Sequence, residues 1–338
     1  MFTKKIIYKN NLINNAKQLK AHNPQSLICS MVKANAYGVG AKEVVKILNN
    51  YVDFFGVSNT TEAQQIQSLT TKKILIVGAL EKYNINPKFS YTCHCLKDVL
   101  YLLKLNKKVK IHLKVNTGMN RFGFNSIIEF KQVLNILKSS NLILEGIFTH
   151  FATTDQFVDK QMSKFKQYIL ACKQANFNPI IHCDNSFVNE FKNHNLDMVR
   201  VGFNLYNRND KKFAPAVKIK SKIVQINSLN IGDFAGYNKK YIATKKTNIA
   251  VIPIGYADGF DSRLIGIDIC IKNKPCKIVN ICMDCTLVDI SNFNIKKDDD
   301  VWILNNVNSL KKYANYLQIS EYEMMTKFSN IRADIIIT

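Results

Sequence analysis

The chain has 338 residues, of which 47% are hydrophobic and 21% are charged. This composition is typical of a globular protein and excludes a wholly disordered chain. The formal net charge of +22 is strongly basic, but lysines are spread over the whole sequence and only five residues are arginines. Proteins that read nucleic acids favour clustered cations and the bidentate arginine fork. The sequence therefore argues against nucleic-acid binding.

No stretch of the sequence approaches the roughly 18 apolar residues that a membrane-spanning helix needs. The first residues, MFTKKIIYKNN, contain only a short apolar run, which is too short for the core of a secretory signal peptide. The nine cysteines are scattered without the spacing of a disulfide framework. These features predict a cytoplasmic protein with free thiols and no membrane attachment.

Short apolar runs alternate with amphipathic helical patterns through the first two thirds of the chain. Such alternation is typical of parallel βαβ units, and about eight units predict a (β/α)8 TIM-like barrel. An open doubly wound sheet is the alternative, although no Gly-x-Gly-x-x-Gly follows the first strand. The expected strands are 26–32, 54–58, 74–77, 91–95, 109–115, 144–149, 180–183 and 198–201. Helical spacing predicts helices at 41–50, 96–105 and 127–137.

The pattern changes near Lys211, where short strands follow one another with turn signals between them. This change predicts a barrel domain over residues 1–212 and a β-rich C-terminal domain over residues 213–338. The expected strands are 216–226, 248–254, 267–271, 276–282, 286–289 and 301–304, and helices are expected at 308–317 and 320–328.

Lys33 stands directly after the first expected barrel strand, in the segment Lys33-Ala34-Asn35-Ala36-Tyr37-Gly38. Barrels of this kind build their active sites at the carboxyl ends of their strands. A lysine in a partly desolvated barrel mouth can lose its proton and form a Schiff base with a carbonyl compound. An ordinary solvated turn is the alternative interpretation of this lysine-glycine loop.

Eight segments together resemble the alanine racemase family, whose members use pyridoxal 5′-phosphate. Residues 31–40 resemble the cofactor-lysine motif of that family, and residues 114–123 resemble its fifth-strand segment. The other matching segments, in family order, are 149–152, 185–186, 198–203, 255–259, 281–284 and 322–323. The resemblance spans nearly the whole chain and implies a barrel followed by a β-domain.

The resemblance implies that Lys33 carries the cofactor as a Schiff base and is the base for D-alanine. Tyr256 would be the base on the opposite face, for L-alanine. Racemisation needs two such groups, because a single base tends to return the proton to the face it came from. A phenol with a pKa of ~10 is a poor base unless nearby cations or hydrogen bonds lower it, and His150 is the matching neighbour. Taken alone, His150 would more readily be interpreted as a buried histidine with satisfied hydrogen bonds, and Tyr256 as a surface tyrosine.

Arg200 would bond to the pyridine nitrogen of the cofactor and to His150, again by resemblance. Many pyridoxal enzymes place an aspartate at this nitrogen, which keeps the nitrogen protonated. An arginine has only N–H donors and cannot accept that proton. Arg200 would therefore favour an unprotonated ring and quick reprotonation of the substrate carbanion, which suppresses side reactions. A structural salt bridge at the end of the barrel is the alternative.

The remaining matched residues would hold the phosphate and the substrate. The phosphate would be bound by the hydroxyls of Tyr37, Ser186 and Tyr322 and by the N–H groups of Gly202 and Phe203. Arg121 would contact the phenolic oxygen of the cofactor, and Arg121 and the N–H of Met283 would bind the substrate carboxylate. Lys114, which is often carbamylated in the family, would orient Arg121. Asp284 would line the entry to the site.

The sequence departs from the family pattern at positions that line the pocket. Asn116 replaces a usual aspartate, and Asn120 replaces a usual glycine. Asn204 and Asn207 replace small residues, and Val279-Asn280 replaces a usual Gly-Arg pair. The clusters Cys93-His94-Cys95, His182-Cys183 and Cys282-Met283-Asp284-Cys285 do not make convincing ligand sets. We therefore predict no required metal.

The sequence is expected to encode an enzyme that interconverts L- and D-alanine with pyridoxal 5′-phosphate and supplies D-alanine for peptidoglycan. By resemblance it acts as a homodimer in which the β-domain of one chain completes the barrel site of the other. A serine racemase or a racemase of broad specificity is the main alternative. A non-catalytic pyridoxal-phosphate carrier would lack the β-domain with Tyr256 and Met283. A fold-related decarboxylase would place an acid where Arg200 stands.

Overall fold

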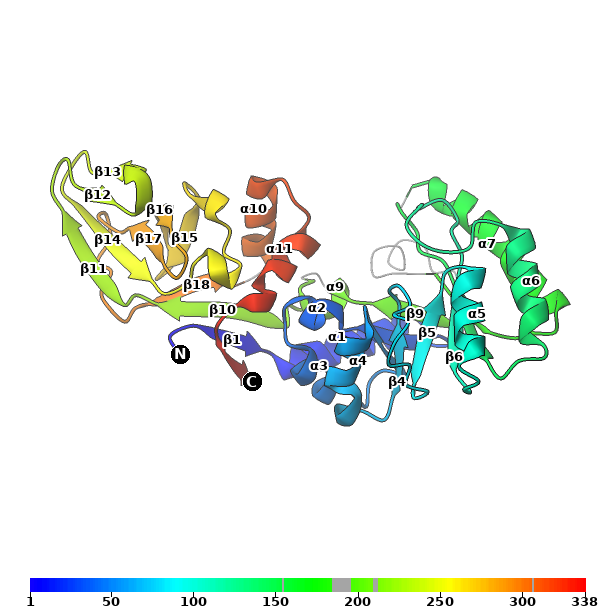
Figure 1. Ribbon diagram of the computed structural model, residues 1–338. Helices are drawn as coiled ribbons and strands as arrows, with labels where there is room; N and C mark the ends of the chain where they lie inside the picture. Colours follow the sequence, from blue (N-terminus) through cyan, green and yellow to red (C-terminus); the bar gives the residue numbers. More distant parts are fainter. Residues whose placement is uncertain (154, 184–195, 209–211, 306) are drawn as a thin grey trace. The chain divides into compact units, whose positions relative to one another are not determined.

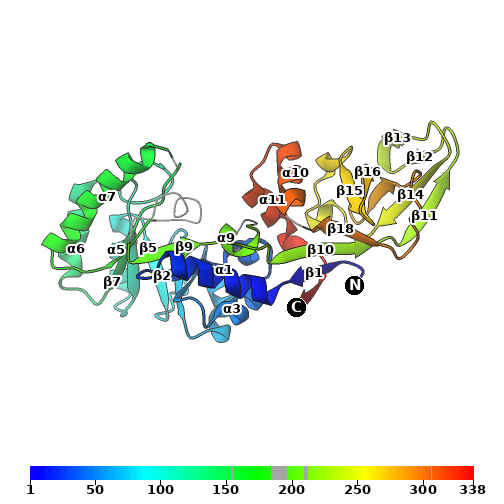
Figure 2. The same ribbon diagram turned by 180° about the vertical axis from the view of Figure 1, so that it is seen from behind.

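The computed structural model describes residues 1–153, 155–183, 196–208, 212–305 and 307–338. They form two compact units (Figures 1 and 2). The barrel unit consists of Ile13–Ala36 and Ala41–Leu205, and the β-rich unit consists of Met1–Leu12, Tyr37–Gly40 and Tyr206–Thr338. The predicted division at 212/213 placed the first twelve residues with the barrel, whereas the structure groups them with the β-rich unit.

Eight parallel strands form the sheet of the barrel unit, in the order β8-β7-β6-β5-β4-β3-β2-β9. The two outer strands of this order, β8 and β9, also contact each other, so the sheet nearly closes on itself. The strands are β2 (Leu27–Met31), β3 (Phe54–Val57), β4 (Lys73–Ile76), β5 (Phe89–Cys93), β6 (Lys110–Lys114), β7 (Ile143–Phe148), β8 (Ile180–His182) and β9 (Met198–Val201). Each overlaps one of the eight predicted strands, so the predicted (β/α)8 barrel is confirmed.

The barrel strands are buried on both faces. Every residue of β3, β5 and β9 is buried, so these strands show no alternation of buried and exposed side chains. Helices cover the outer face of the strands (Figures 1 and 2). They are α1 (Lys9–His22), α3 (Ala41–Leu48), α4 (Thr60–Ile66), α5 (Leu96–Lys104), α6 (Ile127–Leu137) and α7 (Phe157–Gln174). The three predicted helices correspond to α3, α5 and α6.

The segment after β2, α2 (Lys33–Tyr37), contains a left-handed turn. Residues 34–37 all have φ between +51° and +55°, and Gly38 follows with φ +87°. Each L-residue in this region costs about 1–2 kcal/mol, so four in succession must be held by other interactions. The N–H of Ala34 donates to Oε1 of Glu62, and the N–H of Ala41 donates to Oδ1 of Asn35, both at 2.8 Å.

The β-rich unit contains a nine-stranded sheet in the order β11-β14-β17-β16-β15-β18-β10-β1-β19. Its strands are β1 (Lys4–Ile7), β10 (Val217–Lys222), β11 (Gln225–Leu229), β14 (Thr247–Ile252), β15 (Asp268–Ile271), β16 (Lys274–Ile281), β17 (Thr286–Asp289), β18 (Asp300–Leu304) and β19 (Asp334–Ile337). A separate hairpin pairs β12 (Phe234–Ala235) with β13 (Tyr241–Ile242). Strand β1 pairs with β10 in antiparallel and with β19 in parallel orientation, so the two ends of the chain lie side by side (Figures 1 and 2).

The β-rich C-terminal domain predicted from the sequence is confirmed in its main elements. The predicted strand 216–226 is divided in the structure, because the chain leaves β10 after Lys222 and starts β11 at Gln225. Strands β1 and β19 were not predicted. The predicted helices correspond to α10 (Val307–Leu317) and α11 (Glu321–Lys327).

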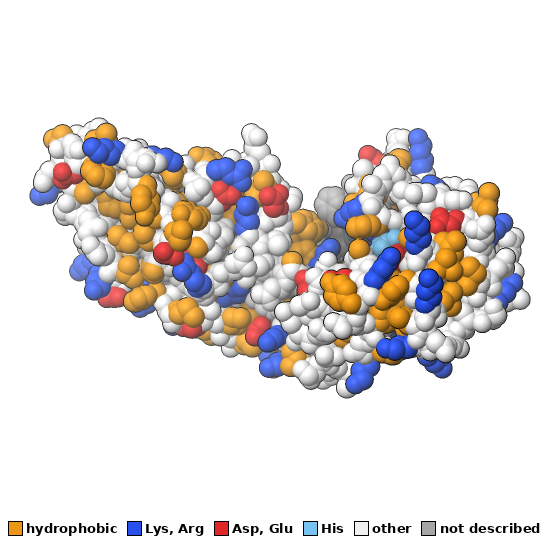
Figure 3. All heavy atoms as spheres, in the orientation of Figure 1, with side chains coloured by type: hydrophobic (Ala, Val, Ile, Leu, Met, Phe, Trp, Pro, Cys, Tyr) orange, Lys and Arg blue, Asp and Glu red, His pale blue; other side chains and the backbone are white. Residues whose placement is uncertain are grey.

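Two properties of the whole chain bear on its partners. Within the described ranges, no helix is long and apolar enough to cross a membrane. On the face shown in Figure 3, lysine and arginine side chains are spread over the surface and do not gather in a single patch. The positive charge therefore has the same even distribution on this face as it has along the sequence.

Candidate active site

Four basic side chains lie together at the carboxyl ends of the barrel strands. Lys33 follows β2, Lys114 ends β6, Arg121 lies in the loop after β6, and Arg200 lies on β9. Arg121 and Arg200 each act electrostatically on both lysines, and all four groups act on His150. This end of the barrel is therefore suited to an anionic ligand.

Lys33 is only partly exposed, and its amine has a lowered pKa. Burial is the main cause, and the positive charges of Arg121 and Arg200 add to it. Glu62 acts in the opposite direction, but its carboxylate is engaged by the backbone, since Oε1 accepts from Ala34 and Oε2 accepts from the N–H of Ser58 at 2.7 Å. A larger share of the Lys33 amine is thus neutral, as a nucleophile and proton acceptor must be.

Lys114 is 5% exposed and its pKa is lowered to about 7. Burial is again the main cause, followed by Arg121, Arg200 and Lys33. Its ammonium nitrogen lies 5.3 Å from the ring centre of Phe122 and 5.6 Å from that of Phe148. Close to neutral pH, a large share of this amine is uncharged.

Arg200 is buried and surrounded by hydrogen-bond acceptors. Its Nη1 lies 2.5 Å from Nδ1 of His182. Its Nη2 donates to the carbonyl oxygens of Thr149 (2.9 Å) and Cys183 (3.1 Å) and lies 3.3 Å from Nδ1 of His150. The guanidinium also stacks on the ring of Phe148, 5.0 Å from its centre. The contact between Arg200 and His150 that the family resemblance implies is present.

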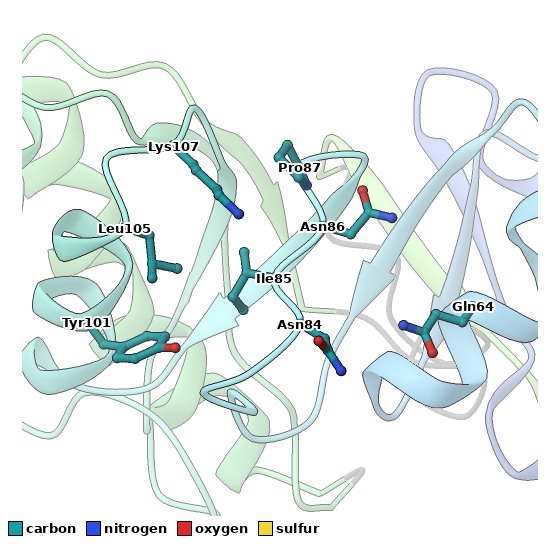
Figure 4. A pocket seen from close by; sticks show the side chains of 8 residues that line it. All are labelled: Gln64, Asn84, Ile85, Asn86, Pro87, Tyr101, Leu105 and Lys107. Atoms are coloured by element: carbon teal, nitrogen blue, oxygen red, sulfur yellow. The ribbon is translucent and has the colours of Figure 1, made fainter.

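A small, narrow hollow lies beside this cluster. It is lined by Lys114, Val115, Asn116, Thr117, Met119, Arg121, Phe122, Thr149 and His150. A second, wider hollow of about 670 Å³ is lined by Gln64, Asn84, Ile85, Asn86, Pro87, Tyr101, Leu105 and Lys107 (Figure 4). Several of these residues directly precede β5 and β6, so the wider hollow lies at the amino ends of the strands, and it contains no predicted site residue.

Tyr256 and Met283 lie on neighbouring segments of the β-rich unit. The N–H of Tyr256 donates to the carbonyl of Cys282 at 3.0 Å, and the N–H of Ala257 donates to that of Met283 at 3.1 Å. Gly255 allows this close packing, because a Cβ atom there would lie 2.3 Å from the Met283 oxygen. The two side chains are 47% and 52% exposed in the single chain.

Arg332 joins two carboxylates next to this pair. It donates to both oxygens of Asp258, at 2.7 and 2.9 Å, and lies 2.8 Å from Asp284. Asp258 also accepts a hydrogen bond from the N–H of Gly255 at 3.0 Å. Arg332 therefore braces both Asp284 and the turn that carries Tyr256, a role that the sequence analysis did not predict.

Tyr37 packs near two other tyrosines of the β-rich unit. Its ring centre is 5.6 Å from that of Tyr206 and 6.3 Å from that of Tyr322. Gly38 packs closely against α11, since a Cβ atom there would lie 2.8 Å from the carbonyl oxygen of Met325. The structure thus brings Tyr37 and Tyr322 together and adds Tyr206, which the sequence analysis missed.

The last predicted phosphate-binding residues lie at the end of the barrel strands. Gly202 directly follows β9, and Phe203 begins the short helix α9 (Phe203–Tyr206). Ser186 lies outside the described residues. In the ranges that the structure covers, no three His, Cys, Asp or Glu side chains are arranged to hold a metal ion.

Comparisons with known proteins agree with this geometry. The family profile described as "Alanine racemase, N-terminal domain" matches residues 7–210, and that described as "Alanine racemase, C-terminal domain" matches residues 216–336. The chain belongs to the alanine racemase family. An alanine racemase of Fusobacterium nucleatum subsp. nucleatum is 34% identical over 345 residues, which cover 95% of each chain.

Solved alanine racemases have the same fold. That of Clostridium difficile is 30% identical, with a TM-score of 0.93 over 100% of this chain and 96% of the other. That of Bacillus anthracis, solved with bound L-Ala-P, is 27% identical, with a TM-score of 0.92 over 100% of this chain and 95% of the other. The family resemblance and the fold class predicted from the sequence are confirmed.

Proposed function

We propose that the chain is an alanine racemase that interconverts L- and D-alanine with pyridoxal 5′-phosphate and supplies D-alanine for peptidoglycan. The observation that carries this proposal is the position of Lys33 beside Arg200 and Arg121 at the barrel mouth, with a lowered pKa. A partly neutral lysine can form an imine, and the arginines favour the anionic groups of the cofactor and substrate.

The residues at the barrel mouth fit the cofactor. When bound, pyridoxal 5′-phosphate supplies an electron sink that makes the α-proton of an attached amino acid removable. Lys33 would hold its aldehyde carbon, and Arg121 would contact its phenolic oxygen. The hydroxyls of Tyr37, Ser186 and Tyr322 and the N–H groups of Gly202 and Phe203 would bind its phosphate.

Two groups of this chain would move the α-proton. The Nζ atom of Lys33 would take or give the proton on one face of the substrate, because its lowered pKa keeps part of the amine neutral. The phenol oxygen of Tyr256 would do so on the other face. His150, which is neutral because burial and the surrounding cations hold its pKa well below its usual value, would orient Tyr256.

Arg200 would hold the ring nitrogen of the cofactor without giving it a proton. Its guanidinium stays charged at any physiological pH and has no acceptor atom. Acceptors from Thr149, Cys183 and His182 fix its orientation. Arg200 would thus donate a hydrogen bond to the nitrogen, which remains an acceptor throughout.

Substrate recognition would use groups from both units. Arg121 and the N–H of Met283 would bind the substrate carboxylate, and Lys114 would orient Arg121. Asp284, which Arg332 holds in place, would line the entry and limit the size of the substrate side chain.

The active form would be a homodimer in the cytoplasm. Tyr256 and Met283 are about half exposed in the single chain, which supports a role in completing the barrel site of a partner chain. All nine cysteines are free, as is usual in a reducing compartment.

The direct test is racemisation by the purified holoenzyme. D-alanine formed from L-alanine would be measured with a stereospecific oxidase, and L-serine would be assayed in parallel. We expect alanine to be the preferred substrate, Lys33→Ala to be inactive, and Tyr256→Phe to bind the cofactor normally while losing most of the L-to-D rate. An enzyme that forms no D-alanine, or that prefers serine, would contradict the proposal.

A further inference from the structure

A line of hydrogen-bonded side chains crosses the interior of the barrel. It starts at Arg200 on β9, passes through His182 on β8 and His112 on β6, and ends at Glu145 on β7. The distance from Nη1 of Arg200 to Nδ1 of His182 is 2.5 Å, and that from Nε2 of His182 to Nδ1 of His112 is 2.9 Å. Nε2 of His112 lies 3.2 Å from Oε2 of Glu145. Each histidine therefore uses both ring nitrogens within the line.

The direction of these hydrogen bonds follows from Arg200. Because a guanidinium can only donate, Nδ1 of His182 must accept, and the proton of His182 must be on Nε2. Nδ1 of His112 then accepts from His182, so the proton of His112 is also on Nε2 and is donated to Glu145. A second proton on either ring would have to sit on Nδ1, which already faces an N–H group. The two hydrogens would then point at each other, and that hydrogen bond would be lost. Both histidines are therefore neutral Nε2–H tautomers while the line is intact.

The surroundings of the two histidines support this state. Both rings are fully buried, and burial lowers the pKa of each. The ring of His182 stacks on Phe148 with centres 4.7 Å apart and an angle of 12°. Gly146 leaves room for His112, because a Cβ atom at that position would lie 2.2 Å from Nδ1. The rings have a single orientation that satisfies all their neighbours.

Glu145 is held as a carboxylate at the far end of the line. Oε1 of Glu145 lies 2.9 Å from Nζ of Lys73, and Oε2 accepts hydrogen bonds from Ser90 and His112. Burial by itself raises the pKa of Glu145, but these hydrogen bonds outweigh it and lower the pKa to about 2. The end of the line therefore remains a hydrogen-bond acceptor over the physiological pH range.

We propose that Glu145 is a positioning residue for Arg200: by accepting the proton of His112 it fixes the tautomers of both histidines, and so presents an acceptor to the Arg200 guanidinium. This inference rests on the proposed function, in which Arg200 binds the cofactor ring. Without Glu145, His112 can carry its proton on Nδ1, and His182 can then turn an N–H toward Arg200. The guanidinium would lose its hydrogen bond to His182, which is one of the contacts that fix its orientation.

The tautomers can be measured directly in the holoenzyme. Nitrogen-15 labelling of histidine gives side-chain spectra of only six residues, in which the shifts of Nδ1 and Nε2 distinguish the two tautomers from the protonated ring. His112 and His182 would be assigned by replacing each with glutamine. At neutral pH we expect both to be Nε2–H tautomers in the wild type, and at least one to show an Nδ1–H population in Glu145→Ala.

Two further variants separate the tautomer effect from a structural one. Glu145→Gln keeps an oxygen that can accept from His112, so its spectra should remain close to those of the wild type. Lys73→Met removes the other ion-pair partner of Glu145 but leaves the His112 bond, so it is the matched control. We expect kcat to fall about tenfold in Glu145→Ala, with less than about a threefold change in KM, and to change little in the other two variants.

The outcomes of the spectra and of the kinetics are independent. A wild-type His182 that carries its proton on Nδ1, or is charged, would overturn the proposal without any variant. Wild-type tautomers and kcat in a folded Glu145→Ala would also overturn it, as would an equal loss of kcat in Lys73→Met. If the wild type fails to racemise alanine while its tautomers are as expected, the proposed function fails and the assignment of the hydrogen-bonded line stands.

Discussion

Asn116 forms the turn at the barrel mouth without adding a negative charge. Its Oδ1 accepts from the N–H groups of Gly118 (3.1 Å) and Asn120 (3.0 Å), as an aspartate in this position could also do. Its Nδ2 donates to the side-chain oxygens of Asn120 (2.9 Å) and Asn125 (2.6 Å), which a carboxylate cannot do. Asn116 and Asn120, which both depart from the family pattern, are thus hydrogen-bonded to each other. The basic cluster, however, lacks the charge of the aspartate usual in the family, and Lys114 becomes the residue able to supply one.

We expect Lys114 to carry a carbamate in the active enzyme. Its pKa of about 7 leaves much of the amine neutral, and a neutral amine adds carbon dioxide and releases one proton. The product exchanges a cation for an anion beside Arg121. Native mass spectrometry in bicarbonate should detect one added carbon dioxide in the wild type and none in Lys114→Gln. Fully active enzyme with an unmodified Lys114 would contradict this prediction.

Ala34→Gly should stabilise the protein. Ala34 is exposed and has φ +51°, a region that costs an L-residue about 1–2 kcal/mol and costs glycine almost nothing. After allowing for the greater freedom of glycine in the unfolded chain, we expect a gain of about 0.5–1 kcal/mol in the free energy of unfolding by urea. Ala63→Gly, in the right-handed and buried helix α4, is the control and should lose stability. A loss in Ala34→Gly would show that the left-handed turn is not strained.

The helices and strands that the sequence predicts are those whose apolar pattern lies within a short stretch of the chain. All eight barrel strands were predicted, because their buried apolar runs are bounded by polar turns. Strand β1 was missed because Lys4–Ile7 is short and pairs only with β10 and β19, which are distant in the sequence. The left-handed turn was missed as well. Its alanines favour a right-handed helix, but the left-handed turn is held by the N–H groups of Ala34 and Ala41, which donate to Glu62 and Asn35.

In the candidate site, too, residues in a local motif could be predicted, whereas residues that meet only in the folded chain could not. Lys33 and Arg200 could be predicted, because one belongs to a motif and the other is a rare residue type in this chain. His112 and Glu145 were missed, and His182 was considered only as a metal ligand. Each stands singly in a strand, and the lateral pairing of β6, β7 and β8 brings the three into one line. No spacing within the sequence encodes such a contact between strands.

The free energy of unfolding of the protein should fall in mild acid, because of ionisable groups in the barrel. Burial lowers the pKa of His112, His150 and His182 below the usual 6.5, so these rings stay neutral in the folded protein and become protonated in the unfolded chain. As the pH falls below about 6.5 the unfolded state binds more protons, and each group reduces stability by up to about 1.4 kcal/mol per pH unit. Glu145, with a pKa lowered from 4.5 to about 2, adds a further loss below about 4.5.

The measurement is the free energy of unfolding by urea between pH 5 and 8. We expect it to fall steadily below about pH 6.5 in the wild type. His182→Gln removes one of the titrating rings and should reduce the slope, whereas His22→Gln, at an exposed position on α1, should leave the slope unchanged. A stability that is flat from pH 8 to 5 would show that the buried rings do not resist protonation.

Neither unit alone contains all of the proposed reacting groups. Lys33, Arg121 and Arg200 belong to the barrel unit, and Tyr256 and Met283 belong to the β-rich unit. Half-exposed Tyr256 and Met283 are braced by backbone hydrogen bonds and by Arg332, so their position is fixed before anything covers them. Such a preformed but uncovered pair suits a self-complementary C2 dimer, in which one interface completes two sites at once.

Complementation between two inactive variants tests the shared site. Lys33→Ala and Tyr256→Ala chains would be unfolded, mixed in equal amounts and refolded with the cofactor. If each site combines Lys33 of one chain with Tyr256 of the other, a mixed dimer contains one doubly damaged site and one intact site. Random pairing then restores about a quarter of the wild-type activity. Each variant refolded alone should remain inactive. If each site used residues of a single chain, no mixture would regain activity, because every site would still lack one of its two bases.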